Sequence, residues 1–196
     1  MHVWICPQNA VNTATEPRMP THYAFCPHCA SPLTPRAHAG SLDVLRRSCP
    51  DAACGFVHWD NPVPVVAAVV EHEGALILAR NKAWTAPFFA LITGFLEKTD
   101  PSPEEAVARE VKEELDLDAT GVHFIGHYRF ERQNQIILAY HVPATGVVTL
   151  GEELAECKRI DPARARYWPV ATGLALRDWL RGQGHDPQPF DVPDKV

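Results

Sequence analysis

Three glutamates in the middle of the chain have a spacing that indicates chemistry. Glu110, Glu113 and Glu114 are so spaced that one side of a helical turn would carry all three carboxylates. Like charges three or four residues apart on a helix repel each other by roughly a few tenths of a kcal/mol per pair. Acids near a helix C-terminus also lie at the negative end of the helix dipole. A divalent cation with oxygen ligands would offset both costs, whereas the alternative is the solvated acidic surface of an ordinary helix.

The helix that must carry these acids has a clear start. Ser102 is followed by Pro103 and by Glu105, which form a capping box with proline at the first helical position. A predicted strand over Phe88–Thr93 precedes it and delivers the chain into Gly94. The residues that supply the apolar side of the helix are Ala106, Val107, Val111 and Leu115. The acidic side is therefore free to face a cleft.

The stretch from Gly94 to Leu117 resembles the signature of the Nudix hydrolases, G-x5-E-x7-R-E-U-x-E-E-x-G-U, where U is aliphatic. Gly94 matches the opening glycine, Arg109–Glu114 matches the core, and Leu117 matches the final aliphatic residue. Fourteen residues separate Gly94 from Arg109 instead of thirteen, and Asp100 is the nearest equivalent of the first glutamate. Asp116 replaces the late glycine. Since aspartate tolerates the left-handed backbone conformation, we expect it to end the helix all the same.

The resemblance implies a catalytic role for each matching position. Glu110, Glu113 and Glu114 would hold one or more magnesium or manganese ions, and Arg109 would orient Glu110 through a charge-assisted hydrogen bond. Such ions neutralise a diphosphate and lower the pKa of bound water. A glutamate would then accept the proton of that water.

A further metal ligand is expected from a loop beyond the signature, as in many relatives. The chain offers Glu152, Glu153 and Glu156 there, and Glu153 is favoured because Glu153-Leu154 precedes a short predicted strand. The alternative for these three residues is a solvated acidic turn.

The candidates for substrate contacts lie just before and just after the predicted strand that enters the signature, and on a neighbouring strand. They are Gly94, Glu97, Trp84, Tyr128 and Phe130. Glu97 could equally be a solvated loop residue. The three aromatic side chains could stack on a base, and the alternative for each is packing in the core or at its rim.

Two pairs of cysteines near the N-terminus predict a second, different metal site. Cys26 and Cys29 form the first pair, and Cys49 and Cys54 form the second. Close pairs at this separation are typical of a structural zinc site with four thiolate ligands. Disulfides are the alternative, and the lack of an evident export signal favours metal. His28 lies inside the first pair and could compete as a ligand.

The pattern of elements predicts an α+β protein. The resemblance implies a Nudix α/β/α sandwich with a mixed sheet, preceded by a small zinc ribbon. We expect a flexible leader (1–21), a zinc ribbon (22–60), a Nudix domain (61–182) and a proline-rich, loosely held tail (183–196). The predicted strands and closing helix are Leu42–Ser48, Val63–Val70, Ala75–Ala79, Phe88–Thr93, Val122–Phe130, Gln135–Val142, Glu156–Ile160 and Thr172–Arg181.

Composition narrows the class of partner. The net charge is −6, and no basic stripe is present, which argues against a nucleic acid as the main partner. The longest apolar run, Pro62–Val70, is far too short to span a bilayer. These features predict a cytoplasmic protein with no membrane contact, and the resemblance makes a homodimer possible.

The resemblance covers about residues 24–182 and is to the zinc-ribbon branch of the family, which includes NADH, FAD and ADP-ribose pyrophosphatases. It implies a metal-dependent pyrophosphohydrolase that acts on a small nucleotide substrate, a nucleoside diphosphate linked to another moiety. The Ser-Gln-Pro-Trp-Pro-Phe-Pro segment of NADH pyrophosphatases is absent, and His127-Tyr128-Arg129-Phe130 stands in its place. The alternatives are a module that binds nucleotides or RNA ends without hydrolysis, and an enzyme that processes RNA ends.

Overall fold

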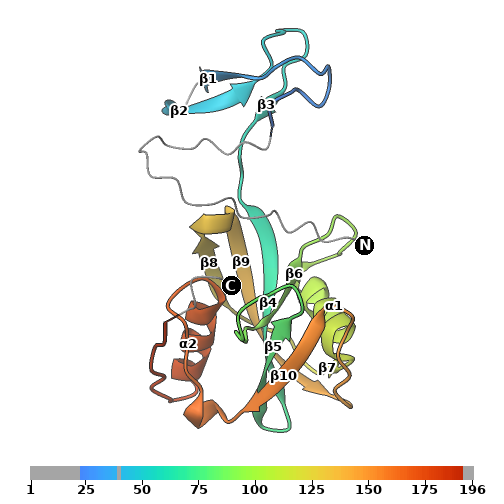
Figure 1. Ribbon diagram of the computed structural model, residues 1–196, viewed down its shortest axis with the longest axis vertical. Helices are drawn as coiled ribbons and strands as arrows, with labels where there is room; N and C mark the ends of the chain where they lie inside the picture. The colour runs from blue at the N-terminus through green and yellow to red at the C-terminus, as the bar shows by residue number, and fades with distance from the viewer. Residues whose placement is uncertain (1–22, 39–40, 192–196) are drawn as a thin grey trace. The chain divides into compact units, whose positions relative to one another are not determined.

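The computed structural model describes residues 23–38 and 41–191, without the side chains of residues 41–43 (Figure 1). The predicted leader over 1–21 lies outside the described residues. The chain divides into two compact units between Asp60 and Asn61. Each unit has its own core and is described separately.

The first unit is a small antiparallel sheet. Its strands are β1 (Thr34–His38), β2 (Ser41–Ser48) and β3 (Val57–His58), in that order across the sheet. The predicted strand over 42–48 is confirmed as β2. The core of this first unit consists of Cys26, Leu33 and Cys49, with Cys54 and Phe56 packed against them. Among the described residues of this unit these few apolar side chains bury little surface, and domains with so small a core commonly need a metal, a disulfide or a partner to fold.

The second unit is built on a seven-stranded mixed sheet. Strand β4 is central: residues 65–68 pair with β6, residues 70–72 pair with β5, and its other edge runs parallel to β9. The strand order is β10-β5-β4-β9-β7, with β6 paired to β4 and β8 paired to β9. The bounds are β4 (Val63–His72), β5 (Ala75–Asn81), β6 (Ile92–Phe95), β7 (Asp118–Ala119), β8 (His123–Phe130), β9 (Gln135–Thr145) and β10 (Leu154–Ile160).

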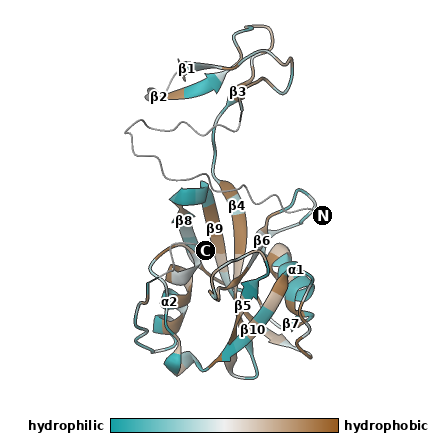
Figure 2. Ribbon diagram, in the orientation of Figure 1, coloured by the Kyte–Doolittle hydropathy of each residue, from teal (hydrophilic) through white to brown (hydrophobic). Residues whose placement is uncertain are grey.

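Two helices cover the two faces of this sheet. Alternate residues of β4 point to opposite faces. Val65, Ala67 and Val69 pack in one cluster with α2 (Thr172–Gly182), and their neighbours 66, 68 and 70 pack in another with α1 (Pro103–Leu115). Figure 2 shows the resulting apolar centre, in which β4 and β9 are hydrophobic for most of their length. The predicted mixed α+β sandwich is confirmed. Two single 3-10 turns, Glu131–Gln133 and Pro162–Arg164, complete the unit.

Most predicted strands agree with the structure, but the one expected over Phe88–Thr93 is wrong in its first half. Only Ile92–Phe95 forms the strand β6. Phe88, Phe89, Ala90 and Leu91 are all buried in the α2 cluster. Four successive residues packed in one cluster do not fit the alternation of a strand, so this segment runs as a loop with a single bridge to β5.

The expectation of a loosely held tail is also wrong for the described residues. Phe190 donates its N–H to the carbonyl of Tyr167, and Tyr167 donates its own to Gln188, at 2.9 and 3.2 Å. The Phe190 ring lies 6.2 Å from Trp168 and 6.3 Å from Phe88. One aromatic anchor among the prolines therefore fastens this segment to the α2 cluster.

Candidate active site

Helix α1 begins and ends where the sequence predicts. The N–H of Glu105 donates to the Ser102 hydroxyl at 3.2 Å, and Pro103 is the first helical residue. Asp116 adopts the left-handed conformation, with φ 55° and ψ 26°, and its N–H donates to the Lys112 carbonyl. Aspartate thus ends the helix in the conformation that a glycine would adopt, and the departure at this position leaves the helix intact.

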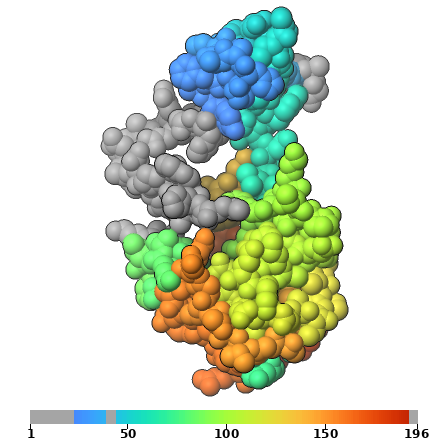
Figure 3. Space-filling model, turned by 90° about the vertical axis from the view of Figure 1, so that its right-hand side faces the viewer, coloured from blue at the N-terminus to red at the C-terminus, as the bar shows by residue number. Residues whose placement is uncertain are grey.

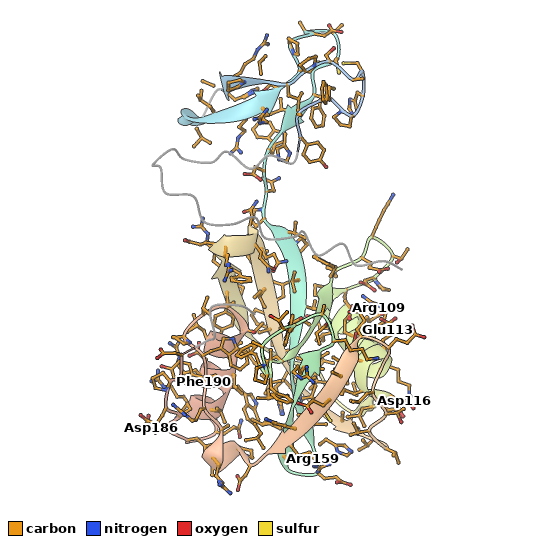
Figure 4. The ribbon with its side chains drawn as sticks, in the orientation of Figure 1. Arg109, Glu113, Asp116, Arg159, Asp186 and Phe190 are labelled. Carbon is orange, nitrogen blue, oxygen red and sulfur yellow. The ribbon has the colours of Figure 1, made fainter. Side chains whose placement is uncertain are left out.

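Arg109 is the hub of the acidic side of the helix. Its Nη1 donates to Glu110 at 2.7 Å and to Glu113 at 3.0 Å, while Nε and Nη2 each reach Asp100 at 3.1 Å. Figure 4 shows Arg109 and Glu113 beside each other on α1, with Asp116 farther along it. One guanidinium therefore offsets the repulsion among three carboxylates and fixes the direction of Glu110.

Glu110 is the buried member of the acidic set, with 9% of its surface exposed. Its carboxyl group lies directly against Gly94: a Cβ added there would be 1.8 Å from Glu110 Cδ. Burial raises the pKa of Glu110 to about 7, although Arg109 acts in the opposite direction. Gly94 is thus needed for its lack of a side chain, because strand β6 approaches the carboxylate closely.

Glu114 contributes an oxygen with no partner. Its Oε2 is buried and makes no hydrogen bond to any described residue. Burial raises the pKa of Glu114, and the charges of Glu153 and Glu113 raise it further. Glu113 itself is more open, with 57% of its side chain exposed. A buried, unpaired carboxylate oxygen beside other acids is costly unless a cation binds there.

The expected further glutamate lies beside Glu114. The segment that leads into β10 is hydrogen-bonded to the end of α1, where Gly151 N–H donates to the Glu114 carbonyl at 2.9 Å. Figure 3 shows the surfaces of α1 and of the β10 segment meeting on one face. Glu156 pairs instead with Arg80 at 3.3 Å, so Glu153 is the one of the three acids whose charge acts on Glu114.

These carboxylates fit a hard divalent cation by their chemistry. Oxygen is the ligand that magnesium and manganese take, and the unpaired Glu114 oxygen would be satisfied by one. The acids do not converge as closely as the cysteines do, since Arg109 holds Glu110 and Glu113. Among the described residues, only the four cysteines bring at least three possible ligand atoms within 4.8 Å of one another.

The aromatic candidates for substrate contacts lie on the face of the sheet that α2 covers, opposite the face that α1 covers. Trp84, Tyr128 and Phe130 pack against the α2 cluster, and the Tyr128 hydroxyl donates to Asp178 at 2.9 Å. The structure does not gather them with the acids of α1. Glu97 lies in the loop after β6, where its N–H donates to Asp100 at 2.8 Å.

Asp100 stands six positions after Gly94, where the signature has its first glutamate, and the sequence alone predicts no contact for it. The structure shows that it binds Arg109.

The four cysteines of the first unit converge as predicted. Sulfur distances are 3.6 Å between Cys26 and Cys54 and 3.5 Å between Cys29 and Cys49. A disulfide needs about 2.05 Å, whereas sulfurs around a tetrahedral zinc with bonds of about 2.3 Å lie roughly 3.8 Å apart. His28 is outside the group and packs its ring on Phe56. The cluster therefore fits a closed, structural zinc site.

The described residues contain no helix with the length and apolar character that crossing a membrane requires.

A Nudix-type hydrolase site is defined by Gly94 on β6 together with the arginine and the acids of α1. They lie on a mixed sheet that is covered by two helices. The NUDIX domain model matches residues 60–179, more than half of the sequence, and the chain belongs to the Nudix family.

Two curated relatives have the same name, NAD-capped RNA hydrolase NudC. The Stutzerimonas stutzeri protein is 28% identical over 144 residues, which cover 74% of this chain and 48% of that protein. The Mycobacterium tuberculosis protein is 35% identical over 123 residues, which cover 59% and 36%. The chain thus spans less than half the length of either relative.

A solved structure has the same fold over most of the chain. The crystal structure of a NUDIX hydrolase from Nitrosomonas europaea matches with a TM-score of 0.67 and 21% identity. The match covers 86% of this chain and 97% of that one.

Proposed function

We propose that this protein is a metal-dependent pyrophosphohydrolase that cleaves the diphosphate of a nucleoside diphosphate linked to another moiety. The observation that carries the proposal is the buried, unpaired Oε2 of Glu114 on a helix that also presents Glu110 and Glu113. Membership of the Nudix family supports the same reaction class.

The proposed ligands of the catalytic metal are Glu110, Glu113, Glu114 and Glu153. Magnesium or manganese held by them would neutralise the diphosphate and lower the pKa of a bound water. Because Glu110 and Glu113 share one nitrogen of Arg109, the arginine keeps both carboxylates directed to the same side before any cation arrives. It is the residue that orients the site.

The reaction would be balanced by one proton transfer. The water oxygen forms a bond to one phosphorus, the bond from that phosphorus to the bridging oxygen breaks, and a glutamate of the set accepts the water's proton. The products are a nucleoside monophosphate and a second phosphorylated fragment.

A diphosphate that joins two nucleosides is the substrate class we favour. The names of the relatives describe hydrolysis of NAD-capped RNA, in which such a diphosphate joins the nicotinamide nucleoside to the first nucleoside of the RNA. Because these names refer to capped RNA, RNA-end processing is the second candidate function. Because the segment typical of NADH pyrophosphatases is absent, we do not single out NADH among free dinucleotides.

A comparison of substrates tests the proposal. Purified protein with magnesium is given NADH, FAD, ADP-ribose and a NAD-capped RNA, and monophosphate release is measured. We expect turnover of at least one of them, and we expect Glu114→Gln to abolish it while the far-ultraviolet circular dichroism is unchanged. Tight binding without turnover would instead favour a binding module, and a Glu114→Gln variant with wild-type turnover would refute the site.

The four-cysteine cluster has a separate proposed role. With four thiolate ligands, a zinc ion would have no open position for water, so we assign it to the folding of the first unit and not to chemistry.

A further inference from the structure

The segment that carries Glu153 is fixed to the end of α1. Thr149 and Gly151 donate their N–H groups to the carbonyls of Leu115 and Glu114, each at 2.9 Å. A Cβ added to Gly151 would be 2.6 Å from the Glu113 carbonyl oxygen, so only glycine permits this approach. The backbone before Glu153 is therefore set by the helix that bears the other acids.

The other side of the segment is held by the end of strand β5. Lys82 donates its N–H to the Glu153 carbonyl at 2.8 Å and its ammonium group to the Glu152 carbonyl at 2.6 Å. Asn81 donates Nδ2 to Glu153 Oε2 at 3.4 Å. The pairing register of β10 with β5 shifts between Leu154 and Glu156, and an irregularity in a strand redirects the side chains next to it.

The Asn81 side chain is itself held in place. Its Oδ1 accepts the N–H of Ala83 at 2.8 Å, which fixes the plane of the amide and leaves Nδ2 directed at Glu153. Glu153 is exposed, and its charge is repelled by that of Glu114. Without a partner, such a side chain would rotate away into solvent.

A neighbouring pair, which joins β5 to β10, shows what a different partner would do. Arg80 binds Glu156 as an ion pair, which neutralises that carboxylate. An amide, in contrast, donates a hydrogen bond and leaves the full negative charge for a cation.

We propose that Asn81 is a positioning residue for the catalytic metal, which directs the carboxylate of Glu153 toward that of Glu114 without neutralising it. The inference rests on the proposed function, because it presumes a divalent cation among these acids. It adds a residue from strand β5, outside the acidic helix and its loop.

Manganese binding to the full, zinc-loaded chain tests the role of Asn81 independently of turnover. Manganese alone is the probe, and its dissociation constant is measured by electron paramagnetic resonance. Asn81→Ser keeps a hydroxyl that can accept the Ala83 N–H but is too short to reach Glu153. We expect it to weaken manganese binding about tenfold, as the loss of a residue that orients a metal ligand does.

A double-mutant cycle separates positioning from a general effect on the fold. If Asn81 acts through Glu153, adding Asn81→Ser to Glu153→Gln changes the dissociation constant by less than about twofold. Arg80→Gln, which removes the charged donor of the adjacent Arg80–Glu156 pair, is the matched control and should leave manganese affinity unchanged.

Two results would overturn the inference. Unchanged affinity in Asn81→Ser, with Glu114→Gln still abolishing manganese binding, would refute the role of Asn81 alone. Manganese binding that Glu114→Gln does not affect would refute both this inference and the proposed metal site.

Discussion

The guanidinium of Arg109 binds both carboxylate oxygens of Asp100, Nε to Oδ1 and Nη2 to Oδ2, each at 3.1 Å. The pair lowers the pKa of Asp100, with the hydrogen bonds from Arg109 as the main cause. Asp100 also accepts the N–H of Glu97, and its own N–H donates to the Glu97 carbonyl. The loop with one extra residue is thereby folded so that a shorter acid still meets the arginine.

This relationship predicts the effect of removing one charge. In Asp100→Asn the amide can accept from Arg109 through one oxygen only, so the arginine loses its two-point support and Glu110 loses its fixed direction. We expect turnover number to fall about 10- to 100-fold with a smaller change in KM. Asp100→Glu, which keeps the charge, should retain most of the activity. Equal turnover numbers for wild type and Asp100→Asn would contradict this.

The contact between Gly94 and Glu110 predicts a second result. In Gly94→Ala the new methyl group would overlap the Glu110 carboxyl, so that carboxyl must move away from Arg109. We expect at least about a 100-fold loss of kcat/KM, comparable to other displaced catalytic groups. Gly182→Ala is the control, since nothing lies within 4 Å of a Cβ there. An active Gly94→Ala enzyme would show that Glu110 does not need its present position.

The features that were predicted correctly from the sequence depend on residues that are near one another in the chain. The start of α1 depends on Ser102, Pro103 and Glu105, which are adjacent in sequence, and the acidic side follows from residue spacing along a helix. The four-cysteine cluster follows from two short cysteine pairs. Each of these features depends on residues that are close in sequence or on a motif with a specific spacing. They can therefore be predicted without knowledge of tertiary contacts.

Relationships between distant residues were not predictable in the same way. Asn81 and Glu153 are 72 positions apart, and only the pairing of β5 with β10 brings them together. The loop over 88–91 is a second case, because its apolar run fits a buried strand until packing against Trp168 and α2 places all four residues in one cluster. Phe190 among prolines is a third, since only its contacts show that the tail is held.

Glu110 predicts how stability depends on pH. Its pKa in the folded chain is raised from 4.5 to about 7, so between these values the folded state holds more protons than the unfolded state. Without added magnesium or manganese, the contribution of this group to the free energy of unfolding should fall as pH rises through that window. Glu114 acts in the same direction, whereas Asp100 acts in the opposite one but only near and below pH 3.8.

Urea denaturation between pH 5 and 8 measures this dependence. Glu110→Gln has no charge to bury at any pH, so its stability should decline less than that of the wild type over the same range. The two proteins differ only at residue 110, so the contributions of all other groups cancel in the difference. Parallel curves for the two proteins would show that Glu110 is not desolvated in solution.

The thiolate cluster predicts that metal loss unfolds one unit and spares the other. Cys54→Ser removes one of four ligands from a unit whose core holds few apolar residues, so zinc content should fall from one per chain and strands β1–β3 should lose hydrogen-exchange protection. The second unit has its own two clusters, and its urea midpoint should be unchanged. Cys157→Ser, on β10 and outside the cluster, should keep the zinc. Full zinc content in Cys54→Ser would mean that another residue completes the site.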